Sequence, residues 1–152
     1  MAPRPRLDAL LALSLAGVAI AAYLSWVALD PAAEAACSGV GDCQAVQGSE
    51  YADVAGIPVA VLGLAMYGAL AALCALRRLG PWRADAAGEP AVLGVWCFAL
   101  ALAGTAFSAY LTYLELFVIE AICIWCVASA LVVTAIALLA AADLAGVRRA
   151  PA

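Results

Sequence analysis

The stretch AICIWCVASALVVTAIALLAAA, from Ala121 to Ala142, carries no charged side chain and contains Cys123 and Cys126 near its start. Roughly 20 helical residues cross the hydrocarbon core of a bilayer, so the stretch predicts a membrane-spanning helix. A C-x-x-C pair at membrane depth is unusual, because reactive dithiols normally work where water reaches them. The stretch therefore indicates a membrane protein in which a cysteine pair lies close to lipid.

Composition places the whole chain in the same class. The chain has 152 residues, of which 68% are hydrophobic and 12% charged, whereas a soluble domain carries about 25% charged residues. Three further apolar runs are long enough to span a membrane: Leu7–Leu29, Ile57–Leu76 and Ala91–Leu114. Unbroken runs favour helices over barrel strands, in which apolar and polar residues alternate. We expect an all-α membrane protein, a single domain over residues 1–152 built as a four-helix bundle, whose last helix covers about residues 118–142.

The positive charges predict how the chain lies in the membrane. All seven are arginines, and they fall at the N-terminus, between the second and third runs, and at the C-terminus: Arg4, Arg6, Arg77, Arg78, Arg83, Arg148 and Arg149. The positive-inside rule makes these places cytoplasmic, so both termini are expected there. The loop at residues 30–55 and the turn from Glu115 to Glu120 are then expected to face outward, and both carry acids without a base.

The N-terminus also resembles a signal peptide, because arginines and an apolar run precede the small residues Ala33 and Ala35. However, the run from Leu7 to Leu29 is longer than the roughly 7–15-residue apolar core of signal peptides. Cleavage would also remove one of the four spans. We therefore expect the first run to remain as a helix.

Cys123 and Cys126, which we call the helix pair, share one face of the predicted helix because they are three positions apart. A helix start directs free N–H groups and the positive end of its dipole at them, and both effects stabilise a reactive thiolate. Burial in lipid opposes a thiolate, so it needs a local partner such as an electrophilic ring. The alternative is that both are small buried hydrophobes, which is our interpretation of Cys74 and Cys97.

Cys37 and Cys43, which we call the loop pair, flank the residues Ser-Gly-Val-Gly-Asp in the most polar part of the chain. Gly39 and Gly41 make this segment pliable, which suits a disulfide that exchanges partners outside the cytoplasm. Two alternatives stay open, a disulfide that only staples the loop and a zinc site made by four cysteines. Structural zinc sites use two short knuckles in a polar fold, so we expect no metal. The chain has no His, which also excludes Ser-His-Asp and Cys-His catalysis.

Four features in this order resemble the vitamin K epoxide reductase family: C-x5-C, then Ser49, then Gly56-Ile57-Pro58, then C-x-x-C in the last helix. The segment YLELFVIEAICIWC, from Tyr113 to Cys126, is especially similar to bacterial members, and the resemblance runs from about Leu10 to Ala140. It implies a four-helix bundle that surrounds a quinone of the menaquinone, ubiquinone or phylloquinone type, with the loop as a lid.

The resemblance also implies a role for each candidate site residue. Cys126 faces the quinone, and Cys123 takes electrons from Cys43. Cys37 is the point at which electrons enter from an external thiol. Ser49 falls where the family places a Ser or Thr beside the redox centre, and its hydroxyl could hydrogen-bond a quinone oxygen or orient a thiol. The alternative for Ser49 is a loop or cap residue before the second helix.

Two features depart from members of the family. Many bacterial relatives carry a thioredoxin-like domain after the last helix, and this chain has only a short segment after Asp143. We therefore expect the electron donor to be a separate exported protein, thioredoxin-like or DsbA-like. Ala130 stands where animal members place a Tyr, which favours reduction of plain quinone over reduction of an epoxide.

These observations predict a quinone-dependent thiol oxidase, a multi-pass protein of the bacterial inner membrane that reoxidises an exported disulfide-forming partner. A second bacterial family of four-helix thiol oxidases also uses quinone, but both of its cysteine pairs lie in outer loops. The alternative from another class is a non-catalytic scaffold or transporter subunit with a structural disulfide. The spans are almost free of ionisable residues, which argues against an ion path, and we expect no nucleic-acid partner.

Overall fold

The computed structural model describes residues 5–30, 32–37, 41–79 and 89–149, with side chains from residue 92 to residue 146 in the last range. Four long helices dominate these residues: α1 (Pro5–Leu29), α3 (Val59–Leu79), α4 (Glu89–Phe117) and α5 (Ile124–Arg149). Each is long and apolar enough to cross a membrane, so the predicted four-helix membrane bundle is confirmed.

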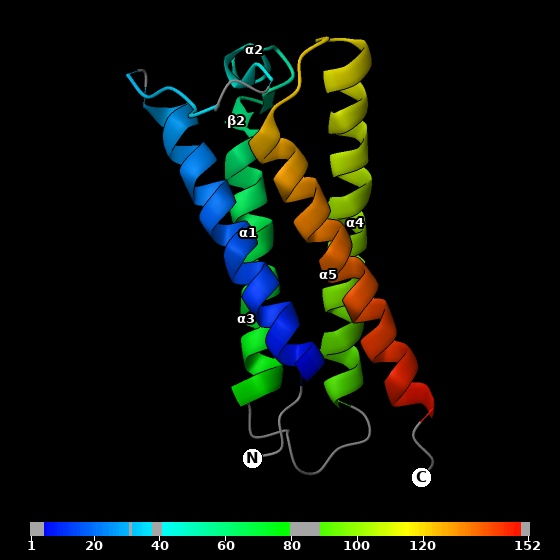
Figure 1. Ribbon diagram of the computed structural model, residues 1–152. Helices are drawn as coiled ribbons and strands as arrows, with labels where there is room; N and C mark the ends of the chain where they lie inside the picture. The colour runs from blue at the N-terminus through cyan, green and yellow to red at the C-terminus, as the bar shows by residue number, and fades with distance from the viewer. Residues whose placement is uncertain (1–4, 31, 38–40, 80–88, 150–152) are drawn as a thin grey trace.

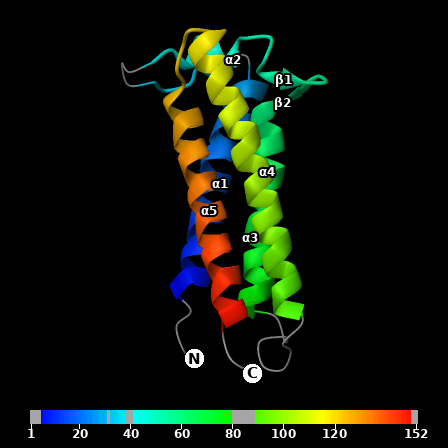
Figure 2. The same ribbon diagram turned by 90° about the vertical axis from the view of Figure 1, so that its right-hand side faces the viewer.

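The long helices form a closed ring in which consecutive helices run in opposite directions (Figures 1 and 2). α1 packs on α3, α3 on α4, α4 on α5, and α5 returns to α1. The start of α1 and the end of α5 lie at one end of the bundle, which we call the arginine end (Figure 1). The opposite end, which we call the loop end, carries the α1–α3 loop and the α4–α5 connection. Every cysteine of the loop and helix pairs belongs to the loop end.

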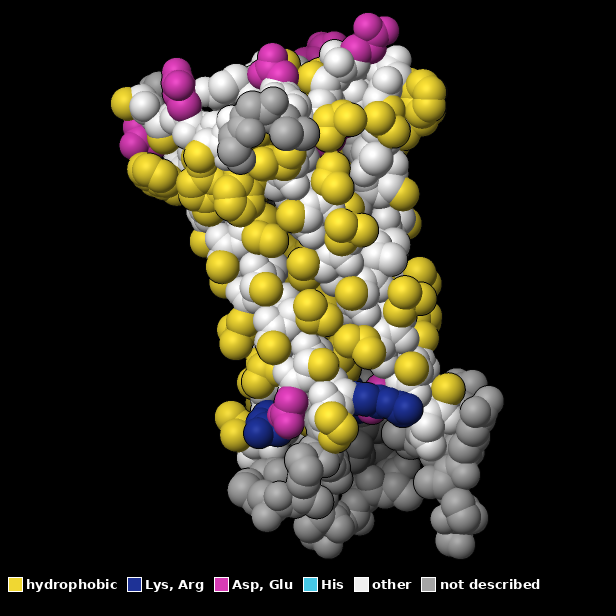
Figure 3. Space-filling view, viewed as in Figure 1, with side chains coloured by type: hydrophobic (Ala, Val, Ile, Leu, Met, Phe, Trp, Pro, Cys, Tyr) yellow, Lys and Arg dark blue, Asp and Glu magenta, His cyan; other side chains and the backbone are white. Residues whose placement is uncertain are grey.

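Charge separates along the bundle in the way that the positive-inside rule requires of a membrane protein. On the face seen in Figure 3, the basic side chains lie at the arginine end, whereas the loop end shows only acidic ones. The described arginines there include Arg77, which lies 2.5 Å from Asp143, and Arg78, which pairs with Asp8. Arg4 and Arg83 lie outside the described residues, as do the side chains of Arg148 and Arg149. Which end faces the cytoplasm stays a prediction.

The α1–α3 loop contains short regular elements. α2 (Cys43–Gln47) is a helix of little more than one turn, and β1 (Asp53–Val54) pairs antiparallel with β2 (Ile57–Pro58). Ala55 and Gly56 connect the strands with φ of 53° and 80°, the positive φ pair of a tight hairpin turn. The second predicted span, placed at Ile57, therefore starts two residues later, because Ile57 and Pro58 belong to the hairpin.

The last helix also begins later than expected. Residues 118–123 connect α4 to α5 without helical structure, so the predicted start at residue 118 is wrong. Glu120 has a φ of 55°, a left-handed conformation that a right-handed helix does not contain. The Cys123 carbonyl accepts the first helical bond, from the Val127 amide at 3.0 Å. Cys123 is therefore the N-cap residue of α5, and of the helix pair only Cys126 lies in its first turn.

The buried centre of the bundle is apolar and includes Cys74 and Cys97, as interpreted from the sequence. The sequence did not reveal that their sulfur atoms lie 3.9 Å apart across the α3–α4 contact. Tyr67 is also fully buried here and links three helices. Its ring fills the space beside Gly17 of α1, and its hydroxyl donates to the Ser129 carbonyl of α5 at 2.8 Å.

Gly17→Ala should destabilise the bundle, because an added Cβ would overlap the ring of Tyr67. Overpacking of this kind costs about 1–3 kcal/mol of unfolding free energy. Gly68→Ala is the matched control, since no atom lies within 4 Å of its added Cβ and both sites are within helices. Thermal unfolding in detergent should show a lower midpoint for Gly17→Ala than for Gly68→Ala. Equal midpoints would contradict the close approach of α1 to α3.

Candidate functional site: four cysteines beside an apolar cavity

A single apolar cluster at the loop end contains all four cysteines of the two predicted pairs. Cys37 and Cys43 come from the α1–α3 loop, and Cys123 and Cys126 come from the start of α5. Cys43 and Cys123 are buried, with 1% and 0% of their surface exposed, whereas Cys37 and Cys126 are partly accessible. Each pair therefore has one buried cysteine and one partly accessible cysteine.

The loop pair forms a disulfide, with a Cα–Cα distance of 6.1 Å that is usual for such bonds. Cys43 is the first residue of α2, and the preceding Asp42 caps this helix. The Asp42 carboxylate accepts a hydrogen bond from the Ala45 amide at 2.9 Å. The cap fixes the start of α2 and holds Cys43 in the cluster.

A backbone contact joins the loop to the residue before the helix pair. The Asp42 amide donates to the Ile122 carbonyl at 3.0 Å. Gly41 has a φ of 84°, and a Cβ at this position would collide with the same carbonyl oxygen. Gly41 is therefore required for close approach of two backbones, in addition to the pliability inferred from the sequence. Gly39 lies outside the described residues.

A second contact fixes the backbone next to Cys37. The Trp125 indole N–H donates to the Ala36 carbonyl at 2.9 Å, and the Ala36 amide donates to the Tyr23 hydroxyl at 2.8 Å. The rings of Tyr23 and Trp125 lie 4.9 Å apart. Trp125 lies between the two cysteines of the C-x-x-C sequence. Its hydrogen bond to Ala36 therefore connects the helix pair to the residue before Cys37. Tyr23 could not be predicted as part of the site, because nothing in the α1 pattern distinguishes it from a lipid-facing aromatic residue.

Cys123 occupies the position where its sulfur can cap α5. The Cys126 amide donates to the Cys123 sulfur at 3.4 Å, the contact that a Ser or Asp oxygen makes at many helix starts. A hydrogen bond from the Cys126 thiol, which outweighs the opposing effect of burial, lowers the pKa of Cys123 to about 7. Near neutral pH, Cys123 is therefore divided between thiol and thiolate, and the thiolate is the form that attacks disulfides.

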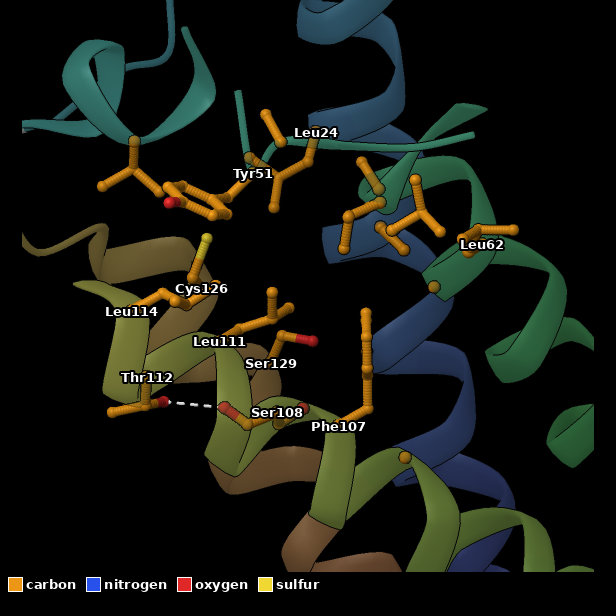
Figure 4. Close-up of a pocket in the computed structure, with 18 of the residues that line it drawn as sticks. Leu24, Tyr51, Leu62, Phe107, Ser108, Leu111, Thr112, Leu114, Cys126 and Ser129 are labelled. Atoms are coloured by element: carbon orange, nitrogen blue, oxygen red, sulfur yellow. Dashed lines mark hydrogen bonds between the residues drawn. The ribbon is translucent and has the colours of Figure 1, made fainter. Parts of the chain in front are cut away.

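A cavity of about 400 Å³ opens beside the helix pair, enclosed by the four long helices and the loop. Its wall is mainly apolar and includes Leu24, Leu62, Phe107 and Leu111 (Figure 4). Of the four cysteines, only Cys126 lines the cavity, and its sulfur points toward the side chain of Tyr51. The helix pair thus connects the buried cysteine cluster to an apolar space.

Ser49 lies on the cavity wall, on the side formed by the loop. Its hydroxyl donates to the Val46 carbonyl at 2.8 Å and so closes the turn after α2. This contact agrees with the alternative expected from the sequence, in which Ser49 is a loop or cap residue. It leaves the hydroxyl oxygen free to accept a hydrogen bond from the cavity side, so a ligand contact by Ser49 stays a prediction.

Glu115 lies in a different place from the one predicted from the sequence. We expected it in an outward-facing turn, but it lies within α4, has 4% of its surface exposed and lines the cavity. Its carboxylate accepts a hydrogen bond from the Cys123 amide at 3.0 Å. The sequence signal for this position was an acid eight residues before Cys123 within an apolar run.

Among the residues with described side chains, no group of three or more His, Cys, Asp or Glu is placed to hold a metal.

The Cys123 thiol should titrate near neutral pH. In reduced protein with Ser at Cys37, Cys43, Cys74 and Cys97, thiolate absorbance should rise through a midpoint at about pH 7, with thiol below it and thiolate above. Adding Cys126→Ala should move the midpoint upward, because the hydrogen bond that chiefly lowers the pKa is lost. A midpoint that Cys126→Ala leaves in place would show that Cys126 does not stabilise the Cys123 thiolate.

Comparison with known families agrees with this geometry. The family model described as the vitamin K epoxide reductase family matches residues 9–141, which include all four cysteines of the site. The match also covers most of each of the four membrane-spanning helices. The chain therefore belongs to the vitamin K epoxide reductase family of membrane thiol–disulfide oxidoreductases.

Proposed function

We propose that the chain is a quinone-dependent thiol oxidase, which takes electrons from an exported thioredoxin-like protein and passes them to a membrane quinone. The observation that carries this proposal is the placement of the four cysteines. All four share one cluster, and only Cys126 among them also lines the apolar cavity. The two pairs then form a continuous route from an accessible disulfide to a space that suits a lipid-soluble ring.

The cavity has the size and character of a quinone site. Its volume of about 400 Å³ lies within the usual range for small-molecule sites, and its wall is apolar with few polar groups. Phe107 and Leu62 offer apolar faces to a flat ring, while Ser49 and Tyr51 offer hydroxyls. When bound, a quinone of the menaquinone, ubiquinone or phylloquinone type would accept two electrons and two protons. Cys126 is the thiol that would face it.

Electrons enter at Cys37, which is partly accessible while Cys43 is buried. A thiolate of the partner attacks the Cys37 sulfur and displaces Cys43 as a thiolate, and the second partner thiol then releases the oxidised partner. This sequence leaves the loop pair as two thiols. The exchange needs no movement of the helices, because the attacked sulfur lies on the loop.

The second exchange passes the electrons inward. The Cys43 thiolate attacks the Cys123 sulfur of an oxidised helix pair and displaces Cys126 as a thiolate. Cys37 then attacks Cys43 of the Cys43–Cys123 disulfide, which breaks that bond, releases Cys123 as a thiolate and re-forms the loop disulfide. In the structure, the loop pair is bonded and the helix pair is free. Cys126 is then reduced and lies on the cavity wall.

The distribution of charge along the bundle supports an exported partner. The described arginines Arg6, Arg77 and Arg78 belong to the helix ends opposite the loop, so the positive-inside rule favours a loop end outside the cytoplasm. A bacterial inner membrane with both termini cytoplasmic is the location we propose. A thioredoxin-like or DsbA-like protein on the outer side would then meet Cys37 directly.

Cysteine variants separate the two steps of the relay. With purified protein and a soluble quinone, Cys126→Ala should abolish quinone reduction with either dithiothreitol or the partner protein as donor. Cys37→Ala should abolish oxidation of the partner but keep part of the dithiothreitol-driven rate, because a small thiol can reach the helix pair without the loop. Cys74→Ala is the control, since Cys74 is buried at the centre of the bundle outside the cysteine cluster.

Two results would refute the proposal. Quinone reduction by Cys126→Ala at the unmodified rate would show that electrons do not pass through Cys126. Oxidation of the partner by Cys37→Ala at the unmodified rate would make the loop pair a structural staple, as expected of a non-catalytic scaffold or transporter subunit.

A further inference from the structure

Glu115 is a buried carboxyl that lies beside both cysteines of the helix pair. Its carboxylate accepts a hydrogen bond from the Cys123 amide at 3.0 Å, and the Cys126 thiol lies near it on the cavity wall. It lines the same cavity as Cys126. One carboxyl thus reaches the capping cysteine, the thiol on the cavity wall and the cavity itself.

No described cation compensates the charge of Glu115. Arg77 and Arg78 pair with acids at the arginine end, and Arg6 donates to the Ala142 carbonyl there. The titratable groups around the site are the helix pair at the start of α5, the loop pair, Tyr51 on the loop, Tyr23 on α1 and Tyr67 on α3. None of these groups is basic.

A buried carboxylate without a cation is costly, and one backbone N–H offsets only part of that cost. Binding a proton removes the charge and therefore the cost. The Cys126 thiol is the adjacent group with a proton to give. The contact between them is therefore suited to a proton that moves from sulfur to carboxylate and back.

We propose that Glu115 is the proton-transfer residue of the helix pair: its carboxylate takes the proton of the Cys126 thiol and delivers it into the cavity. The inference rests on the proposed thiol oxidase function. Oxidation of the helix pair breaks two S–H bonds, forms one S–S bond and releases two electrons and two protons, all of which go to the quinone of that function. Because the pKa of Cys123 is about 7, its thiol is already half ionised at neutral pH. The proton of Cys126 is the one that needs a carrier.

A purely structural role would give Glu115 only the task of holding the Cys123 amide. Glu115→Gln separates the two roles, because the amide oxygen of Gln still accepts that hydrogen bond but cannot take up a proton. Glu115→Asp keeps a carboxyl and should recover part of the function. Glu120→Gln is the matched control, since Glu120 is an exposed acid of the α4–α5 connection.

The first measurement uses quinone-free protein with Ser at Cys37 and Cys43. Infrared difference spectra between the dithiol and disulfide states of the helix pair should contain the carbonyl stretch of a protonated carboxylic acid. The band should disappear in Glu115→Gln and persist in Glu120→Gln. Absence of the band from the unsubstituted background, or its survival in Glu115→Gln, would overturn the inference.

The second measurement is the rate of quinone reduction with dithiothreitol as donor. Glu115→Gln should lower the rate about 100-fold, the lower range for loss of a proton-transfer group, and should weaken its dependence on pH. Glu120→Gln should match the unsubstituted protein. If the unsubstituted protein reduces no quinone, the proposed function itself fails. If it does, and Glu115→Gln reduces quinone equally fast, only the role of Glu115 fails.

Discussion

The contact between the Asp42 amide and the Ile122 carbonyl joins a polar loop to the start of a membrane helix. Two backbones can approach this closely only because Gly41 has no side chain and adopts a positive φ. The contact lies one residue from Cys43 and one from Cys123. Together with the hydrogen bond from Trp125 to the Ala36 carbonyl, it holds the loop disulfide and the helix pair in one buried cluster.

The helix pair lies where water and lipid place opposite requirements on a thiol. A thiolate needs stabilisation that lipid does not provide, yet a lipid-soluble acceptor requires a thiol at an apolar wall. The chain divides these tasks within the helix pair. Cys123 sits at the N-cap of α5, where the helix start and the Cys126 thiol stabilise its charge. Cys126 sits one turn deeper, on the cavity wall, with Glu115 as its neighbour.

Much of this arrangement could be predicted from the sequence, because it depends on features of neighbouring residues in the chain. Apolar length predicts the spans, and the cysteine spacing predicts the two pairs. The N-cap role of Cys123 could not be predicted, since the left-handed Glu120 that delays α5 has no sequence signature. The burial of Glu115 also escaped prediction, because an acid near a helix end is normally exposed. The proximity of Cys74 to Cys97 depends on how α3 and α4 pack.

The proposed relay depends on direct transfer of electrons between Cys43 and Cys123. The double variant Cys37→Ala/Cys126→Ala leaves these two without their usual partners, and mild oxidation should then link them in one disulfide. Mass spectrometry of peptides from the detergent-solubilised protein, treated with and without reductant, detects that bond. We expect a Cys43–Cys123 disulfide within single chains. Two free thiols after oxidation, or bonds that form only between different chains, would contradict it.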